Sequence, residues 1–303
     1  SCAPKLSDAL EKYCKLKGAD RAAQFFKAAK RNVSYVIQHL GDRPLDAYSS
    51  SNAASFRDWL VNKNLSSSSI KRIFSTIRAV FTLTIQEEGL NCNNAFAKTF
   101  LPSDERPKRK SISPEDIKRV QKICLDIADE RRLLVALISD TGMRLSEALG
   151  LVWSDVKLDH KYPHISLIPH SWRPLKTVGS KRLIPLVGAA YEAIKIMHRH
   201  RSTSFLFNSY TDETGCKGNS CSATLNKWLK HYVSEAVIHS FRHSFRDRLR
   251  NAGVQSEIID QLGGWSKQSV GQGYGDGYHL ASLRKAISVL NSTPYEHTSQ
   301  TSI

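Results

Sequence analysis

The amino-acid sequence predicts a mainly α-helical protein with a small antiparallel β-sheet, organised as an N-terminal helical bundle followed by a mixed α/β domain. Apolar residues recur at helical spacing through the first hundred positions. A polar, proline-containing segment interrupts this pattern at 101–111, and short β-type runs occur between 164 and 187. With 303 residues, the chain is long enough for two domains that each bury a core.

The predicted N-terminal bundle occupies residues 1–104 and contains four amphipathic segments. These segments are 6–16, 22–41, 53–65 and 68–90. The turn-forming sequence GDRPLD separates the second from the third, and a run of serines precedes the last. The last helix carries the candidate DNA-binding residues Lys71, Arg72 and Arg78. On a solvated helix face the same cations would bind nothing specific.

A basic linker at 105–111 separates the two predicted domains. The surrounding sequence, LPSDERPKRKS, has two prolines, alternating charge and no apolar period, which is typical of an interdomain connection. Candidate contacts to a DNA backbone within it are Lys108, Arg109 and Lys110. The sequence SPED at 113–116 then predicts a helix start, with a capping serine and carboxylates at the positive end of the dipole.

The second predicted domain, 112–290, combines helices with a few strands. Helical patterns occur at 114–130, 131–142, 188–200, 222–233, 238–253, 256–265 and 278–290. Between them, HISLIP and the runs RPLK and KRLIPLV, the last two joined across TVGS, predict short antiparallel strands with a hairpin turn. The tail at 291–303 is polar, and we expect it to be loose.

The positive charge of the chain indicates a polyanionic partner. Lys and Arg number 44 against 28 Asp and Glu, a formal net charge of +16. Because a basic surface gains free energy when counterions leave phosphates, nucleic acid is the leading candidate, and charge scattered for solubility is the alternative. No apolar run approaches the length of a bilayer span, so we expect no membrane association.

The six cysteines show no regular spacing and no Cys-x-x-Cys pair. Cys216 and Cys221 fall in a predicted loop that contains Gly and Ser, without a second pair of metal ligands. We therefore expect reduced thiols in a cytoplasmic protein, with neither a metal ion nor another cofactor.

Candidate catalytic residues gather at four places in the second domain. In chain order they are Arg144, Glu147, Lys176, His239, Arg242, Trp265 and Tyr274. TGMRLSEALGL places an arginine after a glycine with a glutamate one turn later, and PLKTVGSKRLIPL places a lysine at the edge of the predicted hairpin. IHSFRHSF puts a histidine and an arginine on one helix face, and a tyrosine follows LGGW in a glycine-rich segment.

In this order the motifs resemble those of the tyrosine recombinases, also called the phage integrase family. The family pattern is Gly-x-Arg-x-x-Glu, a lysine on a β-hairpin, His-x-x-Arg, then Gly-His or Gly-Trp and a tyrosine about nine residues later. The N-terminal bundle likewise resembles the core-binding domain of the family, so the resemblance covers nearly the whole chain. It implies a site-specific DNA recombinase, specifically an integrase of a phage or another mobile element.

The resemblance implies a role for each reacting group. Tyr274 would attack the phosphorus and form a 3′-phosphotyrosyl ester, with His239 as its base and Lys176 as the general acid for the leaving 5′ oxygen. The ester preserves the energy of the phosphodiester, so neither ATP nor a metal ion is required. Two copies would bind each double-stranded recombination site, and two sites would assemble a tetramer, with DNA-bending or directionality factors as further partners.

An anion explains why cations are crowded between 238 and 253. Like charges on adjacent turns are unfavourable unless a phosphate joins them, and Arg144 and Arg242 would bind its non-bridging oxygens. Glu147 would hold Arg144. Trp265 stands where many family members have histidine; its indole can donate a hydrogen bond but cannot transfer a proton, and packing in the core is its alternative role. A solvated face or contacts to flanking phosphates account for Arg246, Arg248 and Arg250.

Several alternatives stay open. The rivals of Lys176, Tyr274 and His239 are Lys181, Tyr278 and His243. Family spacing favours the chosen lysine and tyrosine. A type IB topoisomerase-like enzyme and a non-catalytic DNA-binding regulator are alternative functions. The short N-terminal bundle argues against the first, and the intact set of catalytic residues argues against the second.

Overall fold

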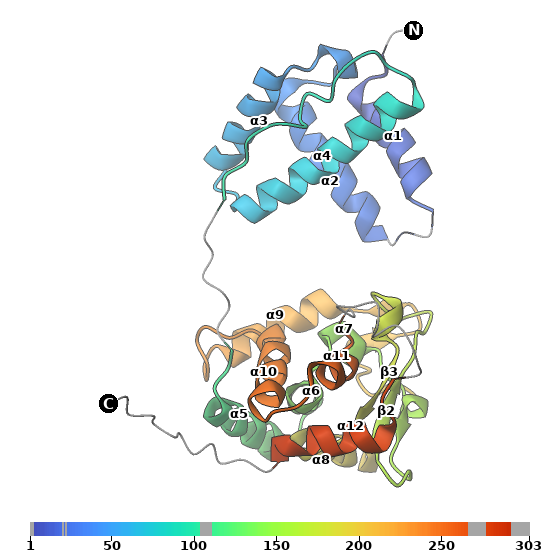
Figure 1. The fold of residues 1–303 in the computed structure, drawn as a ribbon, viewed down its shortest axis with the longest axis vertical. Coiled ribbons are helices and arrows are strands. Elements are labelled where there is room, and N and C mark those ends of the chain that lie inside the picture. Colours follow the sequence, from blue (N-terminus) through green and yellow to red (C-terminus); the bar gives the residue numbers. More distant parts are fainter. Residues whose placement is uncertain (1–2, 20, 22, 104–110, 266–276, 292–303) are drawn as a thin grey trace, which may run out of the picture. The chain divides into compact units, whose positions relative to one another are not determined.

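The structure, a computed structural model, describes residues 3–19, 21, 23–103, 111–265 and 277–291. The chain divides into two compact units, 1–107 and 108–303 (Figure 1). Most described residues are helical and the strands form small antiparallel sheets, so the predicted fold class is confirmed. No helix among these residues is long and apolar enough to cross a bilayer.

The described residues of the first unit form a bundle of four α-helices around an aromatic core. Its elements are α1 (Leu6–Lys17), α2 (Ala23–Leu40), the 3₁₀ turn η1 (Leu45–Ala47), α3 (Ser50–Asn62) and α4 (Ser67–Glu87). Ser49 caps α3, since its hydroxyl accepts a hydrogen bond from the Asn52 N–H at 3.2 Å. The fully buried core side chains include Phe56, Phe74, Phe81 and Phe96.

Helix α6 is the centre of the second unit. It packs against α5 (Pro114–Ile127), α8 (Gly188–Arg199) and α10 (Ile238–Asn251), and these cover α6 (Glu130–Thr141) so that every residue from 133 to 141 is buried (Figure 1). Helix α5 begins where the sequence predicts. The Ser113 hydroxyl accepts from the Asp116 N–H at 3.1 Å, and Pro114 occupies the first turn.

Shorter helices surround this core. They are α7 (Leu145–Leu149), α9 (Gly218–Leu229), α11 (Ser256–Gly263), α12 (Leu280–Ile287) and the 3₁₀ turns η2 (Trp153–Asp155), η3 (Val178–Ser180) and η5 (Ser288–Asn291). A second apolar cluster forms where α10, α11 and α12 meet, with Phe245 and Leu283 fully buried in it.

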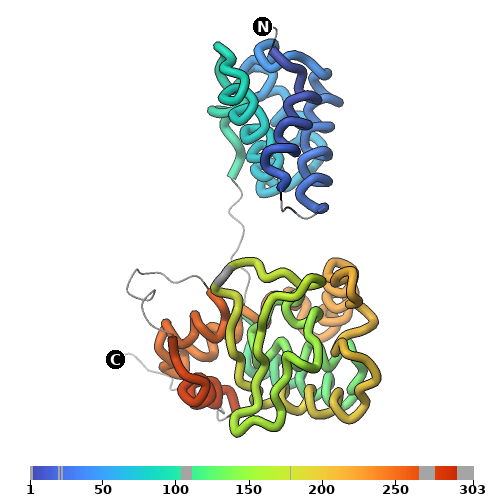
Figure 2. The backbone as a smooth tube through the Cα atoms, turned by 90° about the vertical axis from the view of Figure 1, so that its right-hand side faces the viewer, coloured from blue at the N-terminus to red at the C-terminus, as the bar shows by residue number. Residues whose placement is uncertain are grey.

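The main sheet has the antiparallel order β1-β2-β3. The strands are β1 (Val156–Lys157), β2 (His164–Leu167) and β3 (Arg182–Pro185). Ile165 pairs with Ile184, and both side chains are buried. The chain from β1 to β3, yellow-green in Figure 2, faces the viewer in that view. A second, two-stranded sheet consists of β4 (Thr211–Asp212) and β5 (Gly215–Cys216).

Two sequence-based assignments in this region are wrong. RPLK is not a strand: β3 pairs directly with β2, residues 168–181 connect them, and Arg173 makes an isolated bridge with His170. The buried Arg173 side chain hydrogen-bonds to Asp155 and holds this segment, which has no strand ladder. Cys216 and Cys221 do not share a loop, because the first lies in β5 and the second is buried in α9. Burial raises the pKa of the Cys221 thiol to about 11.

Candidate active site

The turn between α6 and α7 places Arg144. Gly142 ends α6 with a φ of +60°, and its N–H donates to the Ile138 carbonyl at 3.0 Å. A Cβ on this glycine would lie 2.4 Å from Phe245 of α10, so glycine permits the close approach of the two helices. Arg144 then caps α7, and its N–H donates to the Glu147 carboxylate at 3.0 Å.

Glu147 is buried and holds two arginines at once. Its Oε1 accepts from Arg144 at 2.5 Å and its Oε2 accepts from Arg182 at 2.9 Å. Burial alone would raise the pKa of this carboxyl, but the neighbouring Arg182 and Arg144 outweigh burial and hold the pKa of Glu147 below its ordinary value. Arg182 also donates to the carbonyls of Ser180 and Leu262, at 2.7 and 2.8 Å.

Arg182 is a buried partner of Glu147 that sequence reasoning missed. Its side chain faces inward from β3 and links α7 to the end of α11 through the contacts to Glu147 and Leu262. The available signal was a cation among apolar residues in KRLIPL. Such a residue on a half-buried strand must find a partner, but the sequence alone does not name that partner.

Arg242 lies on the buried face of α10 and is only 3% exposed. Its NH1 group donates to the Gly142 carbonyl at 2.6 Å, whereas its buried NH2 group has no hydrogen-bond partner among the described residues. Burial, and then the positive charges of Arg144 and Arg182, lower the pKa of this guanidinium to about 9. An anion here would satisfy the unpaired donor and offset the repulsion.

Trp265 packs beside this group. Its ring centroid lies 4.2 Å from the guanidinium carbon of Arg242 and 4.7 Å from that of Arg246. The backbone N–H of Trp265 donates to the Asp260 carbonyl at 3.0 Å, directly after Gly264 ends α11 with a φ of +63°. The indole also packs against the apolar cluster of α10, α11 and α12. One side chain is therefore both a core aromatic and a neighbour of the candidate arginines.

His239 and Lys176 are both exposed, one on a helix and one on a loop. His239 lies one turn before Arg242 on α10, and its ring centroid is 5.1 Å from that of His243. Lys176 lies in the β2–β3 loop, with its rival Lys181 exposed directly before β3. His239 and Arg242 therefore lie on the same helix, α10.

Tyr274 and the linker cations Lys108, Arg109 and Lys110 lie outside the described residues. The rival tyrosine, Tyr278, is described, and its hydroxyl hydrogen-bonds the Gln255 side chain at 3.2 Å. Gln255 precedes α11, whereas Trp265 follows the other end of that helix, which is about 12 Å long. The Tyr278 hydroxyl therefore lies at the far end of α11 from Trp265.

A family model described as the phage integrase family matches residues 110–279, more than half of the chain. This chain belongs to the phage integrase family, the tyrosine recombinases. It is an enzyme of site-specific recombination that cleaves and rejoins DNA strands.

Curated relatives of the recombinase extend the match beyond the second unit. It is 28% identical over 249 residues to tyrosine recombinase XerA of Thermococcus kodakarensis, covering 79% of this chain and 81% of that protein. It is 24% identical over 313 residues to tyrosine recombinase XerC of Rhodospirillum centenum, covering 93% of this chain and 87% of that protein.

Solved integrases share the fold of the recombinase. The Tn1549 transposon integrase in complex with a circular intermediate DNA superposes with a TM-score of 0.72 at 19% identity, covering 94% of this chain and 98% of that chain. A lambda integrase tetramer bound to a Holliday junction gives a TM-score of 0.69 at 16% identity, covering 88% and 79%. At these identities the likeness establishes the fold alone.

Two further arginines of α10 form ion pairs within the second unit of the recombinase. Arg246 pairs with Asp260 at 2.9 Å, and Arg248 pairs with the buried Asp140, also at 2.9 Å. The predicted solvated face is therefore wrong for Arg248, whose side chain is 13% exposed, and Arg246 is held by a carboxylate. Arg250 is exposed, as predicted.

The three cations of α4 differ from one another. Lys71 and Arg72 are exposed. Arg78 is half-buried: its Nε donates to the Phe96 carbonyl at 2.8 Å and its NH2 group donates to the Thr99 carbonyl at 3.0 Å. This guanidinium is therefore used to hold the segment after α4, a structural task that its sequence position does not reveal.

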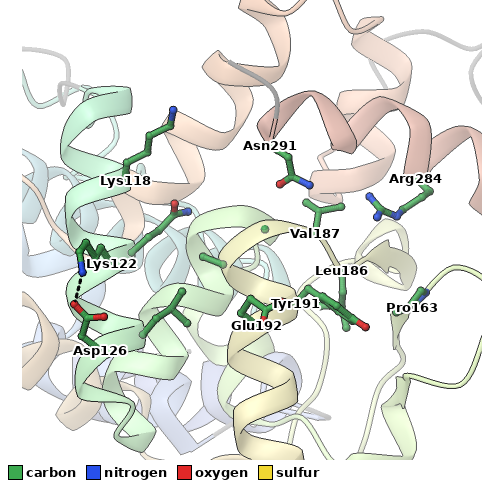
Figure 3. A pocket seen from close by; sticks show the side chains of 14 residues that line it. Lys118, Lys122, Asp126, Pro163, Leu186, Val187, Tyr191, Glu192, Arg284 and Asn291 are labelled. Atoms are coloured by element: carbon green, nitrogen blue, oxygen red, sulfur yellow. Dashed lines mark hydrogen bonds and ion pairs between the residues drawn. The ribbon is translucent and has the colours of Figure 1, made fainter. Parts of the chain in front are cut away.

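A hollow on another part of the second unit lies between α5, α8 and α12 (Figure 3). Lys118, Lys122 and Arg284 contribute to its walls, and Lys122 pairs with Asp126 at 2.8 Å. None of the described candidate residues lines this hollow, so it is separate from the site of Arg144, Arg182 and Arg242. In the described part of the chain no three His, Cys, Asp or Glu side chains gather as a metal site.

Proposed function

We propose that Tyr274 is the nucleophile with which this recombinase cleaves a DNA strand. Its hydroxyl oxygen attacks the scissile phosphorus, and the bond from phosphorus to the 5′ oxygen breaks. The products are a 3′-phosphotyrosyl ester and a free 5′ hydroxyl. A second 5′ hydroxyl then displaces the tyrosine in the reverse step, so that each step exchanges one phosphate ester for another without ATP or a metal ion.

The unpaired donor of Arg242 carries this proposal. Burying a guanidinium without its full set of partners is unfavourable, and Arg144 and Arg182 add repulsion. A phosphodiester that becomes pentacoordinate carries more negative charge than in its ground state, so it gains more from such a group. Arg144 and Arg242 would bind its non-bridging oxygens, with Trp265 beside them, while Glu147 positions Arg144.

His239 and Lys176 suit the two proton transfers. A tyrosine hydroxyl is almost fully protonated at neutral pH, so it must lose its proton as it attacks, and His239 would accept it. The 5′ oxygen leaves with the bonding electrons and would take a proton from Lys176. Both side chains are exposed, as groups that meet a DNA substrate must be.

The substrate would be a double-stranded DNA recombination site of a phage or another mobile element. Relatives include the transposase of transposon Tn916 from Enterococcus faecalis, and solved neighbours include a lambda integrase tetramer bound to a Holliday junction. By analogy we propose a tetramer on DNA in the cytoplasm. DNA-bending or directionality factors stay a prediction, as do DNA contacts by Lys71, Arg72 and the linker cations.

A covalent adduct tests the nucleophile. The full chain is incubated with nicked duplexes whose central region is randomised, and protein–DNA adducts that survive denaturant are recovered and sequenced. We expect adducts from the native chain and from Tyr278→Phe, and none from Tyr274→Phe. Adducts from Tyr274→Phe, or their loss in Tyr278→Phe alone, would overturn the assignment, and none from the native chain would favour a non-catalytic DNA-binding protein.

A further inference from the structure

The loop that carries Lys176 is attached to the protein three residues earlier by buried polar side chains. Asp155, at the end of η2, accepts from Arg173 at 3.0 Å and from His170 at 2.9 Å. Asp155 and Arg173 are almost fully buried. Residues 170 and 173 also exchange two backbone hydrogen bonds, at 3.0 and 3.1 Å, which close a tight turn.

Trp172, at the tip of this turn, provides a second attachment. Its indole N–H donates to the Gly150 carbonyl at 3.1 Å, and its ring stacks on His170 with centroids 4.5 Å apart and planes within 7°. A Cβ on Gly150 would lie 2.5 Å from the Arg173 side chain, so the glycine leaves room for the buried arginine. The turn is thus held to the segment 150–155, which follows α7.

The other end of the loop is attached to Arg144. The Ser180 hydroxyl accepts from Arg144 at 3.2 Å and shares a hydrogen bond with Thr177 at 3.0 Å. Three residues span at most about 10 Å, so Lys176 cannot move far from Arg173. Its ammonium is exposed and forms no ion pair within the described ranges. A lysine that is free to act therefore sits on a loop fixed at both ends.

The buried cluster is a poor means of stabilising a fold. The Nε and NH1 groups of Arg173 are buried without partners among the residues that the structure describes, and burial lowers the pKa of its guanidinium despite the opposing effect of Asp155. Apolar side chains of similar volume would fill the space with less desolvation. A hydrogen-bonded, charged cluster provides a fixed direction for the turn instead.

We propose that Asp155, His170, Trp172 and Arg173 form a clamp that positions Lys176 for proton transfer to the leaving 5′ oxygen. The four are positioning residues, because they act through the backbone between Arg173 and the lysine. The inference rests on the proposed role of Lys176 as the general acid. Loosening the clamp then slows strand cleavage only when the leaving group needs a proton.

A leaving group that needs no proton tests this clamp. The duplex recovered from the adduct selection is prepared with either oxygen or sulfur at the bridging 5′ position of the scissile phosphate. A thiol is far more acidic than an alcohol, so the sulfur departs as a thiolate without a general acid. Single-turnover cleavage of both duplexes is measured for the native chain and for Lys176→Ala, His170→Ala and Trp172→Phe, with Lys181→Ala as the matched control.

On the oxygen duplex we expect Lys176→Ala to cleave about 10²-fold more slowly than the native chain. His170→Ala and Trp172→Phe should cleave about tenfold more slowly than the native chain. On the sulfur duplex all three should cleave within about threefold of the native chain, and Lys181→Ala should match the native chain on both. Clamp variants that are slow on both duplexes, or native-like on both, would overturn the clamp while the lysine assignment stands.

A failure of the proposed general acid is distinguishable. If sulfur does not rescue Lys176→Ala, or if it rescues Lys181→Ala instead, the lysine assignment itself is wrong. Because Asp155→Asn alone leaves Arg173 buried and unpaired, the double variant Asp155→Asn, Arg173→Met is measured in its place, with folding checked by circular dichroism. It should show the same rescue by sulfur, and a folded double variant without rescue would also overturn the clamp.

Discussion

The two units hold their cations in different ways. On α4 of the first unit, Lys71 and Arg72 are exposed to solvent. In the second unit, Arg182 and Arg242 are buried and lie with Arg144 near a single carboxylate. Exposed cations attract any phosphate backbone weakly, whereas buried cations that repel one another favour an anion at one fixed place. We infer that the first group serves affinity and the second serves the chemical step.

Replacing Arg242 gives the largest expected effect and tests the second half of this comparison. Arg242→Met keeps most of the side-chain volume but removes the charge and the unpaired donor. We expect cleavage at saturating protein to fall about 10³-fold, because the donor acts on charge that develops in the transition state. DNA affinity should fall by less than about tenfold. A gel-shift assay and single-turnover cleavage check both, and a lost affinity with an undiminished rate would reverse the comparison.

Glu147→Gln tests whether the arginines depend on this carboxylate. The amide leaves Arg182 buried without its counterion, so we expect a loss of about 3–5 kcal/mol in the free energy of unfolding at pH 7. The folded pKa of Glu147 lies below its ordinary value, so its contribution is present at neutral pH and is lost as pH falls through the folded pKa. Urea unfolding of both proteins at pH 7 and at lower pH should therefore converge in acid.

The matched control for this prediction is Glu192→Gln. Glu192 pairs with Lys195 at 3.4 Å on the surface of α8, where both side chains are more than a third exposed. Its loss should change stability by less than about 1 kcal/mol at either pH. A difference between Glu147→Gln and the native chain that stays constant with pH would show that the charge of this carboxylate is not what stabilises the group.

Lys71→Ala, Arg72→Ala tests the first half of the comparison. We expect DNA affinity to fall about tenfold and the slope of log affinity against log salt to decrease by about 2, with cleavage at saturating protein unchanged. Arg78→Met is the matched control. Since Arg78 donates to two carbonyls, it should lose about 1–3 kcal/mol of stability and leave the salt slope alone. A slope reduced equally by Arg78→Met would contradict this division of roles.

Tyr278→Phe has the smallest expected effect. The substitution removes one exposed hydrogen bond to Gln255, which contributes about 1 kcal/mol or less to stability. The adduct should form within about twofold of the native rate, because this hydroxyl lies at the end of α11 opposite Trp265. Loss of the adduct would make Tyr278, and not Tyr274, the nucleophile.

Local chemistry made much of the fold predictable. Helix α5 begins at Pro114 because Ser113 caps it, and α6 ends at Gly142 because a glycine adopts positive φ there. Both signals lie within a few residues of the boundary that they set. The ordered motifs likewise identified the family, since each is a short pattern that the sequence contains in full.

The missed features depend on partners far apart in the sequence. Asp155 and Arg173 are 18 residues apart, and Glu147 and Arg182 are 35 apart, so no local period connects them. The strands have two to four residues, too few for an alternating pattern to register reliably. The sequence predicts a strand at RPLK because the turn-forming TVGS separates it from KRLIPLV, but Arg173 instead forms a buried ion pair with Asp155.

Charge neutralisation by Arg242 is tested most directly with a scissile phosphate that carries no charge. In a methylphosphonate duplex, a methyl group replaces one non-bridging oxygen at the cleavage position, and cleavage is compared between the native chain and Arg242→Met. On the ordinary duplex the variant should cleave about 10³-fold more slowly than the native chain. If this guanidinium serves to neutralise the phosphate, the variant should cleave the methylphosphonate duplex within about tenfold of the native rate. An equal deficit on both duplexes would contradict that role.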